Sequence, residues 1–340
     1  MTTPIYFSDR PAESDALGRG QFALHLARAL ISVSAGDGLV VGIEGGWGCG
    51  KSTVIGFVKN ELPNCGPEGE NTIVVEFNPW MVSNTGVLVD ALVTQIAAAI
   101  NLDSNDPDKA LKVGEKLLGY VGLIGYLKYL KYVPGVAFAG NIASGFSDLT
   151  DSVANGVKDA REALDEVKKL LPNLDLAKRK SEVVEALRDL DRPIVVIVDD
   201  VDRLSANEIK TIVQAIKAVA DFPRTTYLLA YDRTVVASAL GDGNVEVGLS
   251  YLEKIVQVAY PIPPLFDYQL KNFANQQVQL LLSSLNIKLR AFESSSYSKA
   301  ISHISKLIRH PRDVVRLMNR LMLSLPLPFL TLSTAVFILS

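Results

Sequence analysis

The stretch Gly45-Gly46-Trp47-Gly48-Cys49-Gly50-Lys51-Ser52 decides the fold of this 340-residue chain. It matches the pattern G-x-x-x-x-G-K-[ST], in which glycines let backbone N–H groups turn inward around phosphate oxygens. The apolar run Leu39 to Ile43 before it predicts a strand covered on both faces. The sequence from Lys51 to Glu61 predicts a helix that stops near Pro63. Strand, loop and helix therefore follow in the order that a phosphate-binding loop requires.

Each residue type in this loop has a chemical reason. A helix that begins near Lys51 directs its positive dipole end at a bound anion. The Lys51 ammonium is expected to neutralise charge on the β- and γ-phosphates during catalysis, and the Ser52 hydroxyl to ligate Mg²⁺. A glycine-rich turn that matches by chance is the alternative. The residues expected to bind the nucleotide are Gly45, Gly46, Trp47, Gly48, Cys49, Gly50, Lys51, Ser52 and Thr53.

The second motif is acidic and follows another apolar strand. Ile194 to Val198 ends in Asp199-Asp200, at the carboxyl end of a strand, where α/β sheets bind ligands. We expect Asp199 to hold Mg²⁺ through water and Asp200 to act as the catalytic base that orients the attacking water. The alternative is a pair of acidic residues that only cap a strand. Asp202 and Arg203 are expected to form an ion pair or to contact an adjacent subunit.

Strands alternate with helices along the chain, which predicts an α/β fold, a doubly wound parallel sheet of about five strands. The other expected strands are Thr72 to Phe77, Thr226 to Tyr231 and Val256 to Tyr260. One strand separates the two motifs in sequence, which suggests the sheet class with a further strand inserted between them. The expected parts are an N-terminal nucleotide-binding part (1–100), a helical insertion (101–192), the rest of the core (193–264) and a helical lid (265–340).

Composition restricts the classes of partner and site. The net charge is -3, so no global positive charge attracts a polyanion, and nucleic acid is disfavoured as the main partner. The two cysteines, Cys49 and Cys65, form no CxxC pair or Cys/His cluster, so neither a zinc site nor a disulfide framework is indicated. Met1 to Asp15 lacks the apolar core of a signal peptide. A reducing cytoplasm is the expected location.

Several motifs in sequence order resemble those of one family, the KAP group of P-loop NTPases. Gly46-Trp47-Gly48 lies inside the loop, and two further motifs follow strands. The resemblance also extends to both ends of the chain. The other motifs are Asp9-Arg10-Pro11, Asp15-Ala16-Leu17-Gly18-Arg19, Phe77-Asn78-Pro79-Trp80, Asp199-Asp200-Val201-Asp202-Arg203, Ala230-Tyr231-Asp232-Arg233, Tyr251-Leu252-Glu253-Lys254-Ile255, and Pro311-Arg312-Asp313 with Arg316 and Asn319.

This resemblance implies ATP rather than GTP, dependence on Mg²⁺, and complexes that are often located at a membrane. Some bacterial members are associated with phage exclusion, which suggests a defence role. The resemblance also implies that Arg19 contacts the nucleotide and that Arg312 or Arg316 is a catalytic sensor of the γ-phosphate. An ordinary surface or ion-paired arginine is the alternative for each sensor.

Two apolar stretches leave the relation to a membrane open. Leu117 to Phe146 lies where members of the family often carry membrane spans, but Lys128, Lys131 and Pro134 divide it into pieces shorter than a bilayer requires. An eroded membrane hairpin, an interfacial element, a surface for another subunit and a buried helical hairpin are the open interpretations. The tail Leu323 to Ser340 is also too short for a confident span and suggests a shortened lid.

The leading functional hypothesis is an ATPase that couples hydrolysis of the β–γ bond to movement or assembly. Its expected partners are a second copy of the chain or other proteins, in the cytoplasm or on the inner face of the plasma membrane. The alternative is a nucleotide-gated scaffold with little or no turnover. A small-molecule phosphotransferase would need an acceptor pocket near Asp200, and no sequence feature indicates one.

Overall fold

The computed structural model describes residues 10–34, 36, 38–82, 88–103, 106–130, 176–219, 221–284, 297, 299, 301–302 and 308–324. The chain forms two compact units. One comprises Met1–Leu26, Gly45–Asn60 and Pro261–Ser340, and the other comprises Ala27–Glu44 and Glu61–Tyr260. The loop with the phosphate-binding pattern therefore belongs to the first unit, whereas the acidic motif belongs to the second.

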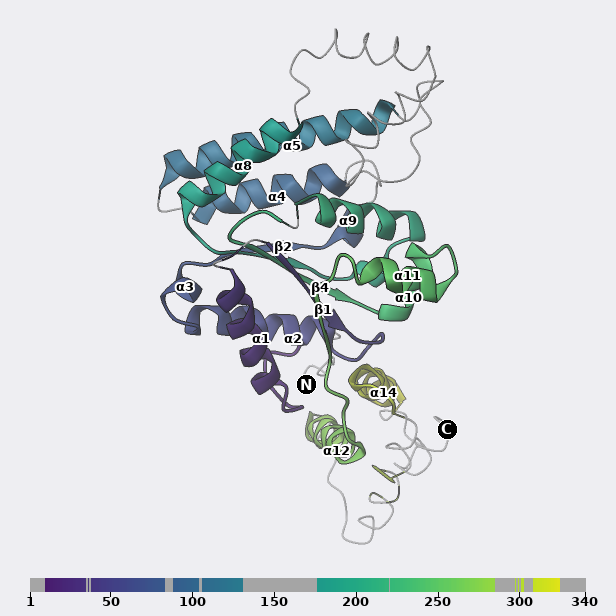
Figure 1. Ribbon diagram of the computed structural model, residues 1–340. Helices are drawn as coiled ribbons and strands as arrows, with labels where there is room; N and C mark the ends of the chain where they lie inside the picture. The colour runs from purple at the N-terminus through teal and green to yellow at the C-terminus, as the bar shows by residue number, and fades with distance from the viewer. Residues whose placement is uncertain are drawn as a thin grey trace. The chain divides into compact units, whose positions relative to one another are not determined.

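The described helices and strands alternate as expected (Figure 1). Helix α2 has the bounds predicted from sequence, and the strands differ from their predicted bounds by at most two residues at either end. The elements are α1 (Gly20–Val33), β1 (Leu39–Glu44), α2 (Lys51–Glu61), α3 (Pro67–Glu70), β2 (Ile73–Phe77), α4 (Leu88–Asp103), α5 (Pro107–Leu130), α8 (Leu176–Leu190), β3 (Ile194–Val198), α9 (Ala206–Val219), β4 (Thr225–Tyr231), α10 (Arg233–Leu240), α11 (Val245–Leu252), β5 (Val258–Pro261), α12 (Asp267–Ser284) and α14 (Pro311–Ser324).

The five described strands form one sheet in the order β2-β3-β4-β1-β5. β4 pairs in parallel with β1 and with β3, and β3 pairs in parallel with β2. The predicted inserted strand is present: β4 lies between the strand that precedes the phosphate loop and the strand that precedes the acidic motif. The strand between the two motifs in sequence, β2, instead lies on the other side of β3.

Burial of the central strands explains why their sequences are apolar throughout. Every residue of β3 and β4 is buried, as expected for parallel strands covered on both faces. Helices α4 and α9 lie over one face of the sheet, and α5 and α8 lie over α4 (Figure 1). Their apolar side chains join those of the strands in one core cluster.

The described part of the helical insertion is a packing layer. Ala110, Val113, Leu117 and Tyr120 of α5 are buried in the core cluster. Leu117 and Tyr120, near the start of the apolar stretch, therefore face protein, whereas Leu118 is exposed. Residues 131–146 and the tail 325–340 lie outside the described residues. Within the described residues, no helix combines the length and the apolar composition that crossing a bilayer requires.

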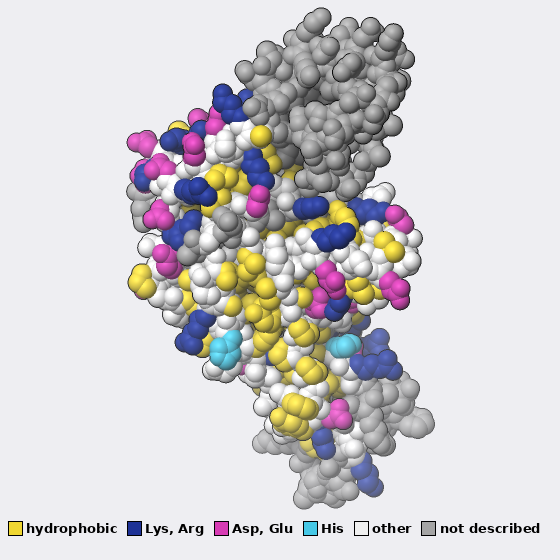
Figure 2. Space-filling view, viewed as in Figure 1, with side chains coloured by type: hydrophobic (Ala, Val, Ile, Leu, Met, Phe, Trp, Pro, Cys, Tyr) yellow, Lys and Arg dark blue, Asp and Glu magenta, His cyan; other side chains and the backbone are white. Residues whose placement is uncertain are grey.

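Charges of both signs cover the layer formed by α4, α5 and α8. Figure 2 shows Lys and Arg interspersed with Asp and Glu on this face. Lys116 of α5 pairs with Glu182 of α8 at 3.7 Å, and Lys180 lies against Asp221 at 2.5 Å. Mixed charge of this kind gives no continuous basic surface on the visible face of this layer.

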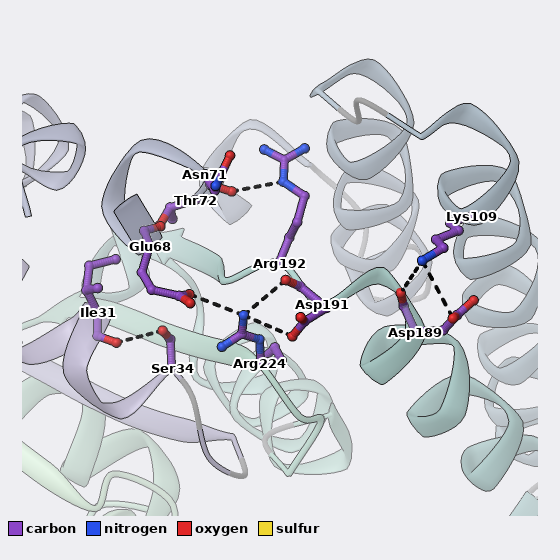
Figure 3. A network of polar contacts seen from close by, with 10 residues as sticks. All are labelled: Ile31, Ser34, Glu68, Asn71, Thr72, Lys109, Asp189, Asp191, Arg192 and Arg224. Atoms are coloured by element: carbon purple, nitrogen blue, oxygen red, sulfur yellow. Dashed lines mark hydrogen bonds and ion pairs between the residues drawn. The ribbon is translucent and has the colours of Figure 1, made fainter. Parts of the chain in front are cut away.

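A polar network holds the amino ends of the strands (Figure 3). Arg224 precedes β4 and pairs with Glu68 at 3.2 Å and with Asp191 at 3.1 Å. Arg192 donates to the carbonyl of Asn71 at 2.9 Å. Arg224 and Asp191 both have positive φ angles, of 61° and 50°. These ion pairs help to hold residues in the left-handed backbone region, which costs free energy for a side chain such as arginine.

The helices after β5 have a core of their own. Val314, Met318 and Leu321 of α14 are buried in a cluster that also contains Leu270 and Val278 of α12. The spacing of the buried α14 residues is that of one helix face. The opposite face of α14 is left for polar side chains, which include Arg312 and Arg316.

Because α11 packs closely against α10, adding a methyl group at Gly248 should change the free energy of unfolding in the opposite direction to adding one at Gly56. A Cβ on Gly248 would lie 1.7 Å from the Ala237 carbonyl oxygen, so Gly248→Ala should lower the free energy of unfolding by about 1–3 kcal/mol. Gly56 in α2 has no such neighbour within 4 Å, and Gly56→Ala should raise that free energy by about 0.5–1 kcal/mol. Urea unfolding followed by circular dichroism measures both, and equal midpoints would contradict the packing.

Candidate functional site

The loop after β1 depends on glycine at defined positions. Gly48 and Gly50 have φ angles of 80° and 96°, in the region that L side chains rarely adopt. A Cβ on Gly45 would lie 2.5 Å from the Sγ atom of Cys49, and the Cys49 N–H donates to the Gly46 carbonyl at 3.3 Å. The backbone of residues 45–50 is thus tightly curled, as a loop that wraps phosphate oxygens must be.

Lys51 folds back onto this loop. Its side chain is buried, with only 8% of the residue exposed, and its Nζ atom donates to the Gly45 carbonyl at 2.8 Å and to the Gly46 carbonyl at 3.5 Å. Carbonyl oxygens are neutral acceptors, and hydrogen bonds to charged acceptors are stronger. A phosphate that entered the loop would therefore compete well for the ammonium.

Arg19 lies against the loop backbone. It is 4% exposed, its Nη1 atom donates to the Cys49 carbonyl, and its Nη2 atom donates to the Pro263 carbonyl at 3.4 Å. A trans peptide is planar with C=O and N–H on opposite sides, so holding the Cys49 carbonyl turns the Gly50 N–H away from Arg19. Burial lowers the pKa of Arg19, while Cys49 and Asp15 act in the opposite direction.

The structure thus gives Arg19 a contact with the loop itself. Its Nε atom is buried and has no partner among the described residues. Asp15 fixes the start of α1 by accepting from the N–H groups of Arg19 at 2.7 Å and Gly20 at 2.8 Å. Arg19 therefore positions the loop, and its contact with nucleotide remains a prediction.

Ser52 and Thr53 occupy the first turn of α2, and both are half-buried. The Thr53 hydroxyl oxygen accepts from the Ala12 N–H at 3.3 Å, so it ties the N-terminal segment to the helix. Ser52 has the position expected of a magnesium ligand in the sequence pattern.

The two predicted sensor arginines lie beside the loop. The Cζ atoms of Arg312 and Arg316 are each 4.5 Å from the ring centroid of Trp47, within the range of a cation–π interaction. The structure therefore brings these two residues of α14 to the loop. They contact the indole of Trp47, which occupies a variable position of the sequence pattern.

The acidic motif begins directly where the β2–β3 pairing ends. Phe77 is paired with Val198, and the Asp199 N–H donates to the Phe77 carbonyl at 3.2 Å. The Asp199 carboxylate accepts from the Asp200 N–H at 2.8 Å. Asp200 has a φ angle of 61°, in the left-handed region where Asp is one of the tolerated residues.

The Asp200 carboxylate is held from two sides. Asn78 donates to Oδ2 at 2.9 Å, and the Nε atom of Arg203 lies 2.7 Å from Oδ1. Arg203 also lies over the ring of Trp80, with its Cζ atom 5.3 Å from the centroid. Arg203, for which the sequence predicts an ion pair or a contact with an adjacent subunit, forms an ion pair with Asp200.

The contact between Asn78 and Asp200 was not predicted from the sequence. A signal was available, because both motifs follow strands, and the carboxyl ends of paired parallel strands meet at one edge. Which side chains touch there depends on the left-handed turn at Asp200, which the sequence pattern does not specify.

A further polar cluster at this edge was also missed. The buried Tyr231 hydroxyl donates to Glu44 at 3.0 Å, and Arg233 lies 3.7 Å from the same carboxylate. Burial, followed by the charge of Glu44, raises the pKa of Tyr231, so this hydroxyl keeps its proton. Glu44 is the last residue of β1 and directly precedes Gly45 in sequence.

The chemistry of the donors suits a hard cation that is bound partly by a ligand. Within the described residues, no group of three or more His, Cys, Asp or Glu could hold a metal ion by itself. Mg²⁺ commonly takes one or two protein oxygens and completes its shell with phosphate and water. The Ser52 hydroxyl and the Asp199 carboxylate are each oxygen donors of this kind, and their joint role remains a prediction.

Comparison with known proteins gives one family and a partial relative. The model of the KAP family P-loop domain matches residues 19–327. The phage T7 exclusion protein of Escherichia coli (strain K12) is 28% identical over 288 residues, which cover 80% of this chain and 36% of that protein. The chain thus spans about a third of the length of this relative.

Two solved structures are similar at low sequence identity. The Walker-type ATPase paby2304 of Pyrococcus abyssi is 12% identical with a TM-score of 0.44, and the match covers 94% of this chain and 71% of that one. The ADP form of the Aeropyrum pernix ORC2 protein is 15% identical with a TM-score of 0.43, covering 97% and 70%. The fold class itself follows from the sheet order and the family match.

The contact between Asn78 and Asp200 can be measured as a coupling free energy. Asn78→Ala and Asp200→Ala should couple by about 1 kcal/mol, because each removes the same charged hydrogen bond. Strain from Ala in the left-handed region occurs in both arms that carry Asp200→Ala, so it cancels. Urea unfolding of wild type, both single variants and the double variant gives the value.

Asp103 provides the control for this cycle. It pairs with Arg192, which precedes β3, so it lies on the order of 16 Å from the Asp200 end of the five-residue strand. Asn78→Ala and Asp103→Asn should be additive within about 0.5 kcal/mol. Additivity of the Asn78 and Asp200 variants would show that their hydrogen bond contributes nothing.

Proposed function

The chain belongs to the KAP family of P-loop NTPases, and from this premise we propose that it binds ATP with Mg²⁺ and hydrolyses the β–γ bond. The family and the loop support nucleotide binding. The choice of ATP, the metal and the hydrolysis step are the proposal. Hydrolysis would convert the bound triphosphate to diphosphate, and this change of ligand would drive movement of the chain or its assembly with partners.

One observation carries the proposal: the buried Lys51 ammonium donates to carbonyls of its own loop. Burying a cation costs free energy unless strong acceptors surround it. A neutral carbonyl at 2.8 Å satisfies one of its three N–H donors well. A triphosphate would supply charged acceptors at the same loop, and hydrogen bonds of the ammonium to charged acceptors are stronger than those to carbonyls.

Mg²⁺ would be held by the Ser52 hydroxyl and, through water, by the Asp199 carboxylate. When bound, the ion offsets charge that develops on the phosphate oxygens. The loop N–H groups and Lys51 contribute to the same stabilisation. The Asp199 carboxylate accepts from the Asp200 N–H, and an ionised carboxylate has about four acceptor sites in all.

Asp200 would orient the attacking water. Its two carboxylate oxygens are fixed by Asn78 and Arg203, and each oxygen still has a further lone pair that can accept from water. Fixed acceptors favour one water position, which reduces the entropy cost of reaching the reactive geometry. Asn78 and Arg203 are therefore positioning residues for Asp200.

The second candidate function is a nucleotide-gated switch with slow or no turnover. The ion pair of Asp200 with Arg203 favours it, because one of the two carboxylate oxygens is already engaged by a guanidinium group. Both candidates require nucleotide binding, and only the rate of phosphate release separates them.

The biological role that we propose is exclusion of phage. This proposal rests on the similarity to the phage T7 exclusion protein, of which the chain spans 36%. The rest of that protein could supply the partner that responds to nucleotide, so this chain is proposed as the nucleotide-dependent part of such a system.

Replacing Lys51 by Ala should weaken binding of ATP by about tenfold to a hundredfold, because a hydrogen bond to a charged group contributes about 1.5–3 kcal/mol. Isothermal titration calorimetry measures the affinity. Lys59→Ala, on the same helix, is the control and should bind as wild type does. If expression of the chain protects cells from phage, plaque counts should rise with Lys51→Ala and not with Lys59→Ala. Unchanged affinity in Lys51→Ala would reject the phosphate loop as the binding site.

Replacing Asp200 by Asn should separate hydrolysis from binding. Asn tolerates the left-handed backbone and keeps one accepting oxygen, so the fold should persist. Loss of the base should lower the rate of phosphate release by about 10²–10⁴-fold, with ATP affinity retained. Asp202→Asn is the matched control. Negligible release from wild type as well would leave the switch as the function, and release unchanged by Asp200→Asn would exclude the base role.

A further inference from the structure

Trp47 is an unusual side chain at an exposed position of the loop. It is 48% exposed, although burial of a large aromatic side chain is favourable. Within the same compact unit, the guanidinium groups of Arg312 and Arg316 each lie 4.5 Å from the centre of its ring. Two cations that share one indole need an explanation beyond simple packing.

Helix α14 is built to present these two arginines together. Residues four positions apart lie on the same face of a helix. The opposite face, with Val314 and Met318, is buried against α12. At the helix start, the Asp313 carboxylate accepts from the N–H groups of Arg309 and His310, both at 3.0 Å. The Asp313 cap and the buried face therefore orient the helix so that Arg312 and Arg316 lie on its other face.

The loop backbone also meets the start of α14. A Cβ on Gly48 would lie 3.3 Å from the Cβ of Arg312 and 3.6 Å from the Cβ of His310. Glycine next to Trp47 thus allows the loop and the helix to approach closely. This approach places the indole within reach of both guanidinium groups.

The strengths of the competing interactions decide what this arrangement can do. A cation–π interaction at an exposed site contributes about 0.5–1 kcal/mol. Arginine binds phosphate through paired, charge-assisted hydrogen bonds, which are stronger and more directional. A phosphate that reached the loop would therefore draw a guanidinium group from the indole.

We propose that Trp47 is a positioning residue that holds Arg312 and Arg316 at the phosphate loop, and that a bound γ-phosphate takes a guanidinium group from the ring. This rests on the proposed nucleotide binding. Transfer of the arginine changes the contact between the loop and α14, so the C-terminal helices respond to the difference between triphosphate and diphosphate. Trp47 supports sensing through the arginines and does not itself need to touch the nucleotide.

The chain offers a direct optical test, since Trp47 and Trp80 are its two tryptophans. In a Trp80→Phe background, the emission of Trp47 should change saturably with Mg²⁺ and the non-hydrolysable analogue adenylyl-imidodiphosphate, and much less with ADP. Calorimetry on the same samples measures binding independently. Binding of the analogue without a change in emission overturns the role of Trp47 and leaves the proposed function intact. Absence of binding of both ligands overturns the proposed function and this inference with it.

Substitutions on α14 test the partner of the ring. Arg316→Met keeps a long, unbranched side chain and removes its charge. It should therefore shift the emission of Trp47 in the absence of ligand. It should also lower the preference for analogue over ADP by about tenfold, as expected when a charged hydrogen bond is lost. Arg316→Lys should restore part of that preference. Arg320→Met, one turn further along α14, should change neither quantity. An equal effect of Arg320→Met, or no effect of Arg316→Met and Arg312→Met, would overturn the proposal.

Discussion

The parallel pairing of β3 with β2 and β4 determines where the acidic motif can act. All five residues of β3 are buried, so its register is fixed by packing on both faces as well as by its ladder bonds. With Phe77 paired to Val198, the residues that follow the two strands must meet at the same edge. Asn78 reaches Asp200 for this reason, and a slip by one residue would turn every side chain of the strand to the other face.

The phosphate loop is held by cations that at present have backbone partners. Lys51 donates to Gly45 and Gly46, and Arg19 donates to Cys49. Burying Arg19 with its Nε atom unpaired opposes folding, because a buried polar group without a partner loses its hydration. In return the peptide between Cys49 and Gly50 is fixed in one orientation. A loop that is ordered in advance loses less entropy when an anion binds.

Charged residues have different roles at the two ends of the strands. At the amino ends, Arg224, Asp191 and Glu68 pair with one another and help to hold two positive φ angles. At the carboxyl ends, the two carboxylate oxygens of Asp200 accept from Asn78 and Arg203, and each has a further lone pair that water could use. Ion pairs that are closed among protein groups contribute to structure, whereas acceptors that are only partly used can serve a ligand.

Much of the fold could be predicted because it depends on local pattern. The apolar runs at Leu39–Glu44 and Ile194–Val198 identified buried strands, and the glycines with Lys51 and Ser52 identified the loop and the start of α2. These features follow from side-chain burial and backbone freedom, which are properties of neighbouring residues. The family also followed from the order of short motifs along the chain, and the model match over residues 19–327 confirms it.

What the sequence by itself determined was therefore the phosphate loop, the acidic motif and the α/β class. The tertiary structure decided which strand lies between β1 and β3, that Arg203 pairs with Asp200, that Tyr231 donates to Glu44, and that Trp47 receives two arginines from α14. Each of these contacts joins segments whose approach depends on strand order, a left-handed turn or helix packing. Strand order, the turn and helix packing are set by the free energy of the whole fold, so a local residue pattern does not predict them.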